Sequence, residues 1–349
     1  MFNKTNIDKD TILRGLRFAV IISLVISSLI ILFTIDEDTL QRLLTKISAR
    51  YVFYLLIIMI LNWIFAGLKI KVLVHTIGDT ISLLDGIIVY LGGTFVSFVT
   101  PFASGGGPYQ VYFLHKKGVN IGKSSTVVVA QFILRLFFFG TLTPIFMIFF
   151  NDLISPGAIP GYIFYVTFGI AVIFSVGIIV LTLIPDIMDQ ILNLIFKIKR
   201  LKNFFKNSYR AKRILVKARR ELQEFRESLQ LLIKNKWRLL LATFYTIIYW
   251  SLIFMIMPVV LKGLGVEPNF LRAYVMQTII YLIIPFMPTP GASGIAEVGF
   301  ASLLVAFIPR NLIGLVTFGW RLYTFYLVLL VGGTIALKEI NRVGSIENE

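Results

Sequence analysis

The sequence predicts an all-α polytopic membrane protein, and three observations lead to this fold class. Hydrophobic residues make up 57% of the 349 residues and charged residues only 15%, with a mean hydropathy of +0.84, a balance that soluble domains do not show. Apolar runs of the length that crosses a bilayer recur along the chain. Two further apolar stretches are interrupted by nearly the same phrase, at Thr100–Gly105 and Thr289–Gly294. We therefore expect a single integral membrane domain over residues 1–349.

Six apolar runs are long enough to be full spans: Phe18–Ile35, Tyr51–Val74, Thr126–Phe150, Tyr162–Ile184, Leu239–Leu261 and Leu312–Leu337. The first run follows two arginines, as the apolar core of a signal peptide would. It is too long for such a core, and acidic residues follow it in place of a small-residue cleavage site. We expect it to be a retained span.

The two interrupted stretches, Ile81–His115 and Phe270–Ile308, are short for a pair of spans each once the break is removed. The basic residues that flank the runs can all be cytoplasmic only if the first stretch enters and leaves from that side. The same reasoning makes the second stretch enter and leave from outside. We therefore predict two re-entrant broken-helix hairpins in an inverted-topology repeat, over residues 51–150 and 239–337. The alternative is two short helical hairpins that cross the membrane completely.

Residues 186–238 form a basic segment that we expect to be cytoplasmic. Between Lys197 and Arg238 there are fifteen Lys or Arg and three Glu, a net charge of +12 in a chain whose total is +16. The positive-inside rule predicts this bias. From Arg210 to Leu232, apolar residues recur at helical spacing, which indicates an amphipathic helix lying on anionic lipid of the cytoplasmic leaflet. A nucleic-acid partner is not favoured, because no aromatic stacking platform accompanies the charges. Both termini are expected to be cytoplasmic, in the cell (plasma or inner) membrane.

Two arginines stand deep inside predicted spans. Arg135 and Arg321 each follow one of the breaks and each precede a leucine. An arginine at a helix centre costs about 2.5–3.5 kcal/mol on insertion scales, so such residues usually face a polar interior with a function. Because guanidinium binds phosphate with two parallel hydrogen bonds, both arginines are candidates for substrate contact. The alternative is a structural ion pair of either arginine with Glu297.

Glu297 is the one acidic residue in the second interrupted stretch. It could cap the half-helix that follows the break, pair with an arginine, or meet an amine on the substrate. The first repeat has Gln110 at the comparable place, so the two halves differ chemically. The remaining candidate binding residues offer backbone N–H groups and close backbone approach to an anion: Gly105, Gly106, Gly107, Pro290, Gly291 and Gly294. A tight turn without a ligand is the alternative for Gly105–Gly107.

Catalytic and metal-binding patterns are absent from the sequence. There are no cysteines and only two histidines, and no Ser/His/Asp set, zinc signature or pair of carboxylates appears. Gly122-Lys123-Ser124 lacks the earlier glycine and the strand that a phosphate loop requires. We expect no cofactor, no metal and no catalytic residue.

The broken stretches resemble a known family. The segment Phe98–Pro108 with Gly118-Val119 and Arg135, and the segment Pro288–Glu297 with Arg321, are similar to the lysylphosphatidylglycerol synthetase/flippase membrane-domain family. The resemblance covers nearly the whole chain, and it implies transfer of a phospholipid or a lipid-linked head group between leaflets. Many members carry an acid near the position of Gln110. In two-domain members a soluble C-terminal domain transfers lysine from its tRNA to phosphatidylglycerol, and we expect no such domain here.

The leading expectation is a flippase-like protein for an anionic phospholipid. One alternative is a phosphatidylglycerol lysyltransferase-type enzyme, acting alone or with a soluble partner. The other is a structural membrane adaptor, in which neither Arg135 nor Arg321 matters beyond stability. A homo-oligomer is compatible with the sequence.

Overall fold

The computed structural model describes residues 9–35, 49–150, 169, 209–305 and 307–346. This part of the chain contains helices and no strands. The main helices are α1 (Lys9–Thr34), α3 (Ala49–Thr76), α4 (Leu83–Val99), α5 (Gly106–Lys116), α6 (Ile121–Phe149), α10 (Tyr209–Lys234), α11 (Lys236–Gly263), α12 (Phe270–Ile283), α13 (Ile295–Leu304), α14 (Ile313–Arg321) and α15 (Leu327–Ile346). Short 3₁₀ turns η1 (Pro101–Ala103), η3 (Ile284–Phe286), η4 (Pro290–Ala292) and η5 (Arg310–Leu312) join some of them, and a π-helical segment, η6 (Leu322–Tyr326), lies between α14 and α15.

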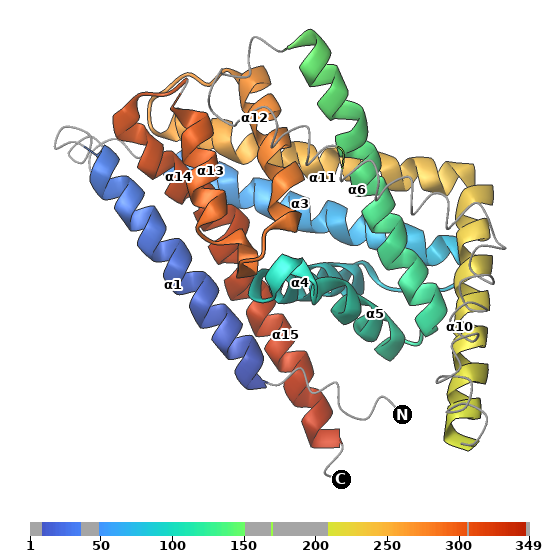
Figure 1. Ribbon diagram of the computed structural model, residues 1–349. Coiled ribbons are helices and arrows are strands. Elements are labelled where there is room, and N and C mark those ends of the chain that lie inside the picture. The colour runs from blue at the N-terminus through green and yellow to red at the C-terminus, as the bar shows by residue number, and fades with distance from the viewer. Residues whose placement is uncertain (1–8, 36–48, 151–168, 170–208, 306, 347–349) are drawn as a thin grey trace.

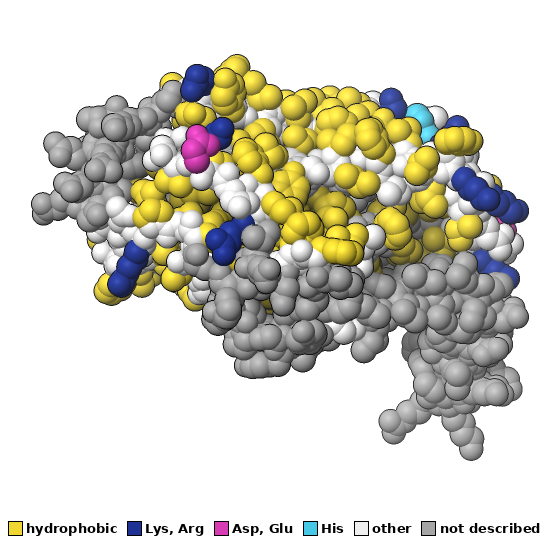
Figure 2. All heavy atoms as spheres, turned by 90° about the horizontal axis from the view of Figure 1, so that it is seen from above, with side chains coloured by type: hydrophobic (Ala, Val, Ile, Leu, Met, Phe, Trp, Pro, Cys, Tyr) yellow, Lys and Arg dark blue, Asp and Glu magenta, His cyan; other side chains and the backbone are white. Residues whose placement is uncertain are grey.

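The prediction of a helical membrane protein is confirmed. Five helical stretches of the described chain are long and apolar enough to cross a bilayer: Leu16–Thr34, Ala49–Thr76, Ile121–Thr143, Lys236–Gly263 and Arg310–Ala336. They correspond to five of the six predicted spans, and the sixth, Tyr162–Ile184, lies outside the described residues. Hydrophobic side chains cover the middle of the face in Figure 2, and the Lys and Arg side chains lie mostly toward its two ends.

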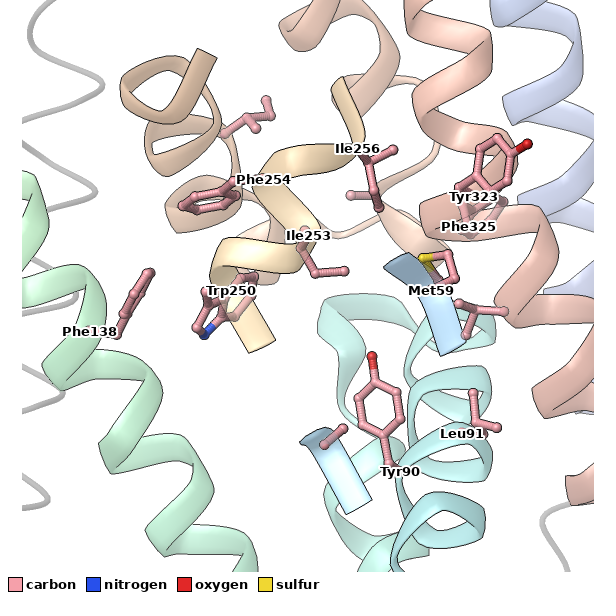
Figure 3. Close-up of a cluster of buried hydrophobic side chains, with 14 of the residues drawn as sticks. Met59, Tyr90, Leu91, Phe138, Trp250, Ile253, Phe254, Ile256, Tyr323 and Phe325 are labelled. Carbon is pink, nitrogen blue, oxygen red and sulfur yellow. The ribbon is translucent and has the colours of Figure 1, made fainter. Parts of the chain in front are cut away.

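An aromatic core holds α6, α11 and α12 together. Trp250 of α11 packs edge-on against Phe139 of α6, with ring centroids 4.8 Å apart, and against Tyr281 of α12 at 5.4 Å. Phe254, one helical turn beyond Trp250, is fully buried. In Figure 3, Phe138 faces Trp250 from α6, and the hydroxyl of Tyr90 points from α4 toward the segment of α11 that carries Trp250 and Ile253. Buried aromatic pairs of this kind add specific packing to the area that they bury.

Polar contacts gather the ends of several helices at one end of the bundle. Lys117, after α5, pairs with Asp85 at the start of α4 at 2.6 Å, and Lys123 of α6 pairs with Asp79, which follows α3, at 3.0 Å. Arg238 of α11 donates to the carbonyl of His75 at the end of α3. This end, which also holds α10, is the one that the charge distribution predicts to be cytoplasmic. The start of α1 and the end of α15 lie together in the lower part of Figure 1.

Both predicted breaks are present, and their backbones begin alike. Phe102 and Gly291, at matching positions of the two phrases, have positive φ of 54° and 62°. The alanines that follow, Ala103 and Ala292, both have φ of 52°. A positive φ is strained for a residue with a Cβ atom. The first break therefore carries two strained residues and the second carries one.

The two breaks contact each other. The N–H of Phe102 donates to the carbonyl of Met287, with a nitrogen–oxygen distance of 3.2 Å. The helices that follow the breaks are short, since α5 has 11 residues and α13 has 10. About 20 residues are needed to cross a bilayer. That the hairpins stop inside the membrane, and that the halves form an inverted repeat, stays a prediction.

Helix α10 confirms the predicted helix in the basic segment, although the start of residues 186–238 lies outside the described residues. It lies crosswise to α11 (Figure 1). Its middle and its C-terminal part pack on the protein: the N–H of Gly122 donates to Glu221 at 2.7 Å, and Leu229 and Leu232 are buried. The apolar side chains that we expected to face lipid thus face the bundle at this end of the helix.

Candidate functional site

Arg321 and Glu297 form a buried ion pair beside the second break. The Nε of Arg321 donates to Glu297 Oε1 at 2.8 Å, and Nη2 donates to the carbonyl of Gly291 at 3.2 Å. Arg321 is 3% exposed and Glu297 is fully buried. Pairing is what permits two charges to remain in such a place, because a buried charge without a partner costs several kcal/mol.

The carboxylate of Glu297 has three donors from three parts of the chain. Besides Arg321, the N–H of Gly294 donates to Oε2 at 2.7 Å, and the hydroxyl of Ser23 in α1 donates to Oε1. Ser23 also shares a hydrogen bond of 2.8 Å with Tyr326. Glu297 therefore caps α13 and pairs with Arg321 at the same time. Two of the three roles that the sequence left open for it are both present. Ser23, a serine inside the first apolar span, is a site residue that sequence reasoning missed.

Aromatic rings enclose this ion pair. The guanidinium of Arg321 lies 4.6 Å from the ring centroid of Phe325 and 5.4 Å from that of Trp320. Phe325 belongs to the π-helical segment that begins directly after Arg321, and its ring packs against Phe98 of α4 at 5.1 Å. Single π-helical turns occur frequently at functional sites. The segment connects the ion pair of the second half to the first hairpin.

Arg135 lies in a different environment. It is near the middle of α6, where its Nη2 donates to the carbonyl of Tyr281 at 2.9 Å. Its guanidinium lies 5.3 Å from the ring centroid of Trp250 and 5.7 Å from that of Phe139. Within the described chain it has no carboxylate within ion-pair distance. Aromatic residues connect the two arginines. Arg135 donates to the carbonyl of Tyr281, whose ring packs against Trp320 at 5.9 Å, and Trp320 in turn contacts Arg321.

Lys69 is a third cation within the bundle, and it is buried. It is 7% exposed and lies in α3, seven residues before the end of that helix. Its ammonium is 4.8 Å from the ring centroid of Tyr249, which packs against Trp250 at 5.0 Å. The sequence suggested only that Lys69 marks the cytoplasmic end of its span. A lysine about two turns inside an apolar helix is the signal that could have identified it.

The glycine-rich segment of the first break serves helix packing. Gly105 donates its N–H to the hydroxyl of Thr100 at 3.0 Å, so this N–H is already engaged. A Cβ on Gly106 would lie 2.7 Å from the carbonyl oxygen of Gly93, which shows how closely α5 approaches α4. Gly107 is less confined, with Val128 as its nearest neighbour at 3.4 Å.

Gln110 lies on α5, where its carbonyl oxygen accepts a hydrogen bond of 3.0 Å from Gln131 of α6. Gln131 is one helical turn before Arg135. Both amides are half-buried. The structure thus places Gln110 against the helix that carries Arg135.

Pro290, Gly291 and Gly294 shape the second break around the ion pair. Pro290 is buried at the start of η4. Gly291 supplies the carbonyl that Arg321 contacts, and a Cβ on it would meet the ring of Phe325 at 2.4 Å. Gly294, with φ of 89°, gives its N–H to Glu297. These groups therefore hold Arg321 and Glu297 in place, and their contact with a substrate stays a prediction.

No group of three or more His, Asp or Glu side chains in the described part of the chain could hold a metal ion. Within the bundle, the described residues instead provide hydrogen-bond donors, aromatic rings and two cations without an acidic partner, Lys69 and Arg135. Such a set can bind and orient an anion.

Comparison with known proteins assigns the chain to a group of membrane proteins. A family described as the lysylphosphatidylglycerol synthase TM region matches residues 20–332. A UPF0104 membrane protein of Archaeoglobus fulgidus is 28% identical over 338 residues, which is 95% of this chain and 98% of the relative. Another of Methanocaldococcus jannaschii is 25% identical over 351 residues, 97% of both chains. A third, of Pyrococcus horikoshii, is 25% identical over 74% of this chain and 77% of its own length. No solved structure matches the chain.

Proposed function

Since the chain belongs to the lysylphosphatidylglycerol synthase transmembrane-region family, we propose that it moves an anionic phospholipid or lipid-linked head group between the leaflets of a membrane. A polar head group must cross the apolar layer for this to happen. The protein must then provide polar groups within the apolar layer, and its head-group site must be able to open alternately to the two sides of the membrane.

The observation that carries the proposal is the contact between two helix breaks among apolar spans. Backbone that is not helical is tolerated at membrane depth only where protein buries it or where it lines a polar cavity. Transporters place broken helices at their substrate sites near the midplane. In this chain the hydrogen bond from Phe102 to Met287 brings the two breaks together, and both arginines lie on the surrounding helices. We propose that the hairpins are re-entrant and form an inverted repeat.

The two arginines have different roles in this proposal. Arg321 is neutralised by Glu297 and fixes the second break, whereas Arg135 has hydrogen-bonding capacity left for a phosphate oxygen. Arg135 has one hydrogen bond to the described chain, and a guanidinium has five N–H donors. Gln110 and Gln131 lie on the same helix contact and can add amide groups to the path.

We also propose an orientation for the protein. The end that carries α10, the start of α6 and the end of α15 faces the cytoplasm of a cell membrane, where α10 contacts anionic lipid. Lys116 pairs with Glu339 at this end at 3.1 Å, which ties α5 to α15. With no nucleotide-binding pattern in the sequence, the movement is passive or driven by a gradient.

The test is lipid translocation in proteoliposomes. Purified protein is reconstituted with a trace of fluorescent phosphatidylglycerol, and an impermeant quencher measures how fast the label leaves the inner leaflet. We expect wild-type protein to exceed protein-free vesicles and vesicles that contain an unrelated helical membrane protein. Equal rates in all three preparations, across several anionic lipids and with an imposed proton gradient, would contradict the proposal.

A further inference from the structure

Lys69 and Arg135 form a pair of cations that the described protein does not neutralise. Lys69 makes no ion pair and no hydrogen bond with the described chain, and Arg135 makes one hydrogen bond, to a carbonyl. The rings that they contact, Tyr249 and Trp250, pack against each other with centroids 5.0 Å apart, so the two positive charges lie in the same part of the bundle and repel each other. Arg321 differs from them, since Glu297 balances its charge.

The contacts with aromatic rings do not balance this pair. Lys69 is buried and Arg135 is half-buried. A contact with an aromatic ring offsets only part of the cost of removing such a charge from water. Two like charges add their mutual repulsion. An anion between them would remove the repulsion and supply the missing hydrogen-bond acceptors.

The surroundings suit a phosphate that carries an apolar group. Tyr249 and Trp250, adjacent in α11, each face one of the cations, at 4.8 Å from Lys69 and 5.3 Å from Arg135. The hydroxyl of Tyr249 lies 3.0 Å from that of Tyr90 of α4, so a phenolic donor is available beside Lys69. Four helices, α3, α4, α6 and α11, therefore direct cationic, phenolic and aromatic groups to one place inside the bundle.

We propose that Lys69 and Arg135 together bind one phosphate group of a lipid, with Tyr249 and Trp250 lining the site. This inference rests on the proposed lipid transport for the identity of the ligand, and it names Lys69 as a binding residue. The ammonium and the guanidinium would share the phosphate oxygens, and Arg135 would keep its hydrogen bond to Tyr281. The shared chemistry is a phosphate ester anion, which a soluble phosphate could also present.

Ligand-dependent thermal stability tests the site without measuring transport. The delipidated, detergent-purified protein is heated with short-chain phosphatidylglycerol, with short-chain phosphatidylcholine or with inorganic phosphate. Each is compared in wild type, Lys69→Gln, Arg135→Gln and the matched control Lys71→Gln, a half-buried lysine on the same helix. We expect phosphatidylglycerol to raise the midpoint of wild type and of Lys71→Gln by at least about 2 °C. In Lys69→Gln and Arg135→Gln this shift should be lost.

The ligand-free protein provides a second readout, which separates binding from a structural role. Because Lys69 is buried and repelled by the half-buried Arg135, its removal should leave the midpoint of Lys69→Gln unchanged or raised. If Lys69 were instead held for its contact with Tyr249, the variant would be less stable than Lys71→Gln. That result, or a full phosphatidylglycerol shift in Lys69→Gln, would overturn the site.

The two proposals fail separately. Lipid translocation by wild type together with an unchanged phosphatidylglycerol shift in both variants contradicts the site and leaves transport standing. A shift that depends on Lys69 and Arg135 in a protein that moves no lipid supports the site and contradicts transport. An equal shift with inorganic phosphate supports the anion site and assigns it to a soluble phosphate.

Discussion

At the scale of single residues, three cations within the bundle divide into two classes: Arg321 and Lys69 are buried and Arg135 is half-buried, but only Arg321 has a counter-charge. Arg321 has a carboxylate, a backbone carbonyl and two aromatic rings as partners, so its charge is balanced within the protein. Lys69 and Arg135 have aromatic rings and a single carbonyl. The presence of a counter-charge, rather than depth alone, distinguishes a cation that holds the fold from one that is available to a ligand.

The ion pair makes the first prediction. Glu297→Gln keeps the shape of the side chain but leaves Arg321 buried and unbalanced, and breaking a buried pair on one side costs about 3–5 kcal/mol. We expect a clear fall in the thermal unfolding midpoint, measured by intrinsic fluorescence in detergent. The double variant Glu297→Gln, Arg321→Met should recover part of the loss.

Glu267→Gln is the matched control for this prediction. Glu267 faces Lys262 at 3.7 Å, but its side chain is 90% exposed. Exposed pairs contribute little, so the midpoint should stay at the wild-type value. Equal midpoints for Glu297→Gln and Glu267→Gln would show that the buried pair does not stabilise the fold.

At the scale of elements, the two breaks combine strain with close helix packing. The first break holds Phe102 and Ala103 at positive φ, and α5 begins directly afterwards against α4. Gly106 is required at that contact because a Cβ there would approach both the carbonyl oxygen of Gly93 and the hydroxyl of Ser97, at 2.7 and 1.9 Å. Gly107, the next residue, has ordinary space around it.

The neighbouring glycines make the second prediction. Gly106→Ala should destabilise the protein by about 1–3 kcal/mol, because the added methyl overpacks the α4–α5 contact. Gly107→Ala is the control, and it should remain near wild type or gain slightly from the better helix propensity of alanine. The thermal midpoint of both variants checks this. Equal tolerance of the two substitutions would contradict the close packing at Gly106.

The sequence predicted the spans and the helix breaks better than it predicted the side-chain contacts between distant helices. Span length, helix breakers and the deep arginines are local features, so the five described spans, both breaks and the Arg321–Glu297 pair could be anticipated. Ser23 could not be anticipated, and for Lys69 only its depth in the span could be, because the partners of both residues lie on helices far away in the sequence. Ser23 contacts Glu297 across 274 positions, and Lys69 meets a ring of α11. From the sequence, both arginines had the same candidate role as substrate contacts. In the folded protein their surroundings differ, because Arg321 pairs with Glu297 and Arg135 donates to a carbonyl.

At the scale of the whole molecule, the charged contacts define one end of the bundle. Lys116, Lys117 and Lys123 reach acidic partners from α15, from the start of α4 and from the residues after α3. The hairpin of α4 and α5 therefore opens at that end, with its tip at the second break. Transport between leaflets requires such a polar tip to lie within the apolar layer.

Cysteine labelling makes the third prediction, and it concerns the orientation of the chain. The sequence has no native cysteine, so single cysteines report their positions without interference. Cysteines at Leu84, which is 65% exposed at the start of α4, and at Arg220 of α10 should react with an impermeant reagent from the same side. A cysteine at Glu267 should react from the other side. Tyr90, in the middle of α4, is buried and therefore not suitable for labelling.

Two labelling patterns would contradict the orientation. If Leu84 and Arg220 react from opposite sides, the first hairpin does not open toward the basic helix. If Glu267 reacts from the same side as Arg220, α11 does not cross the membrane. Either result would also remove the basis for the inverted repeat.

The most direct measurement is the head-group selectivity of lipid translocation. Rates for fluorescent phosphatidylglycerol and phosphatidylcholine are compared in proteoliposomes that contain wild type, the double variant Lys69→Gln, Arg135→Gln, or the control Lys71→Gln. We expect wild type and Lys71→Gln to move phosphatidylglycerol at least about tenfold faster, which corresponds to about 1.4 kcal/mol. The double variant should lose most of this preference. An unchanged preference in a well-folded double variant would contradict the role of the cation pair in transport.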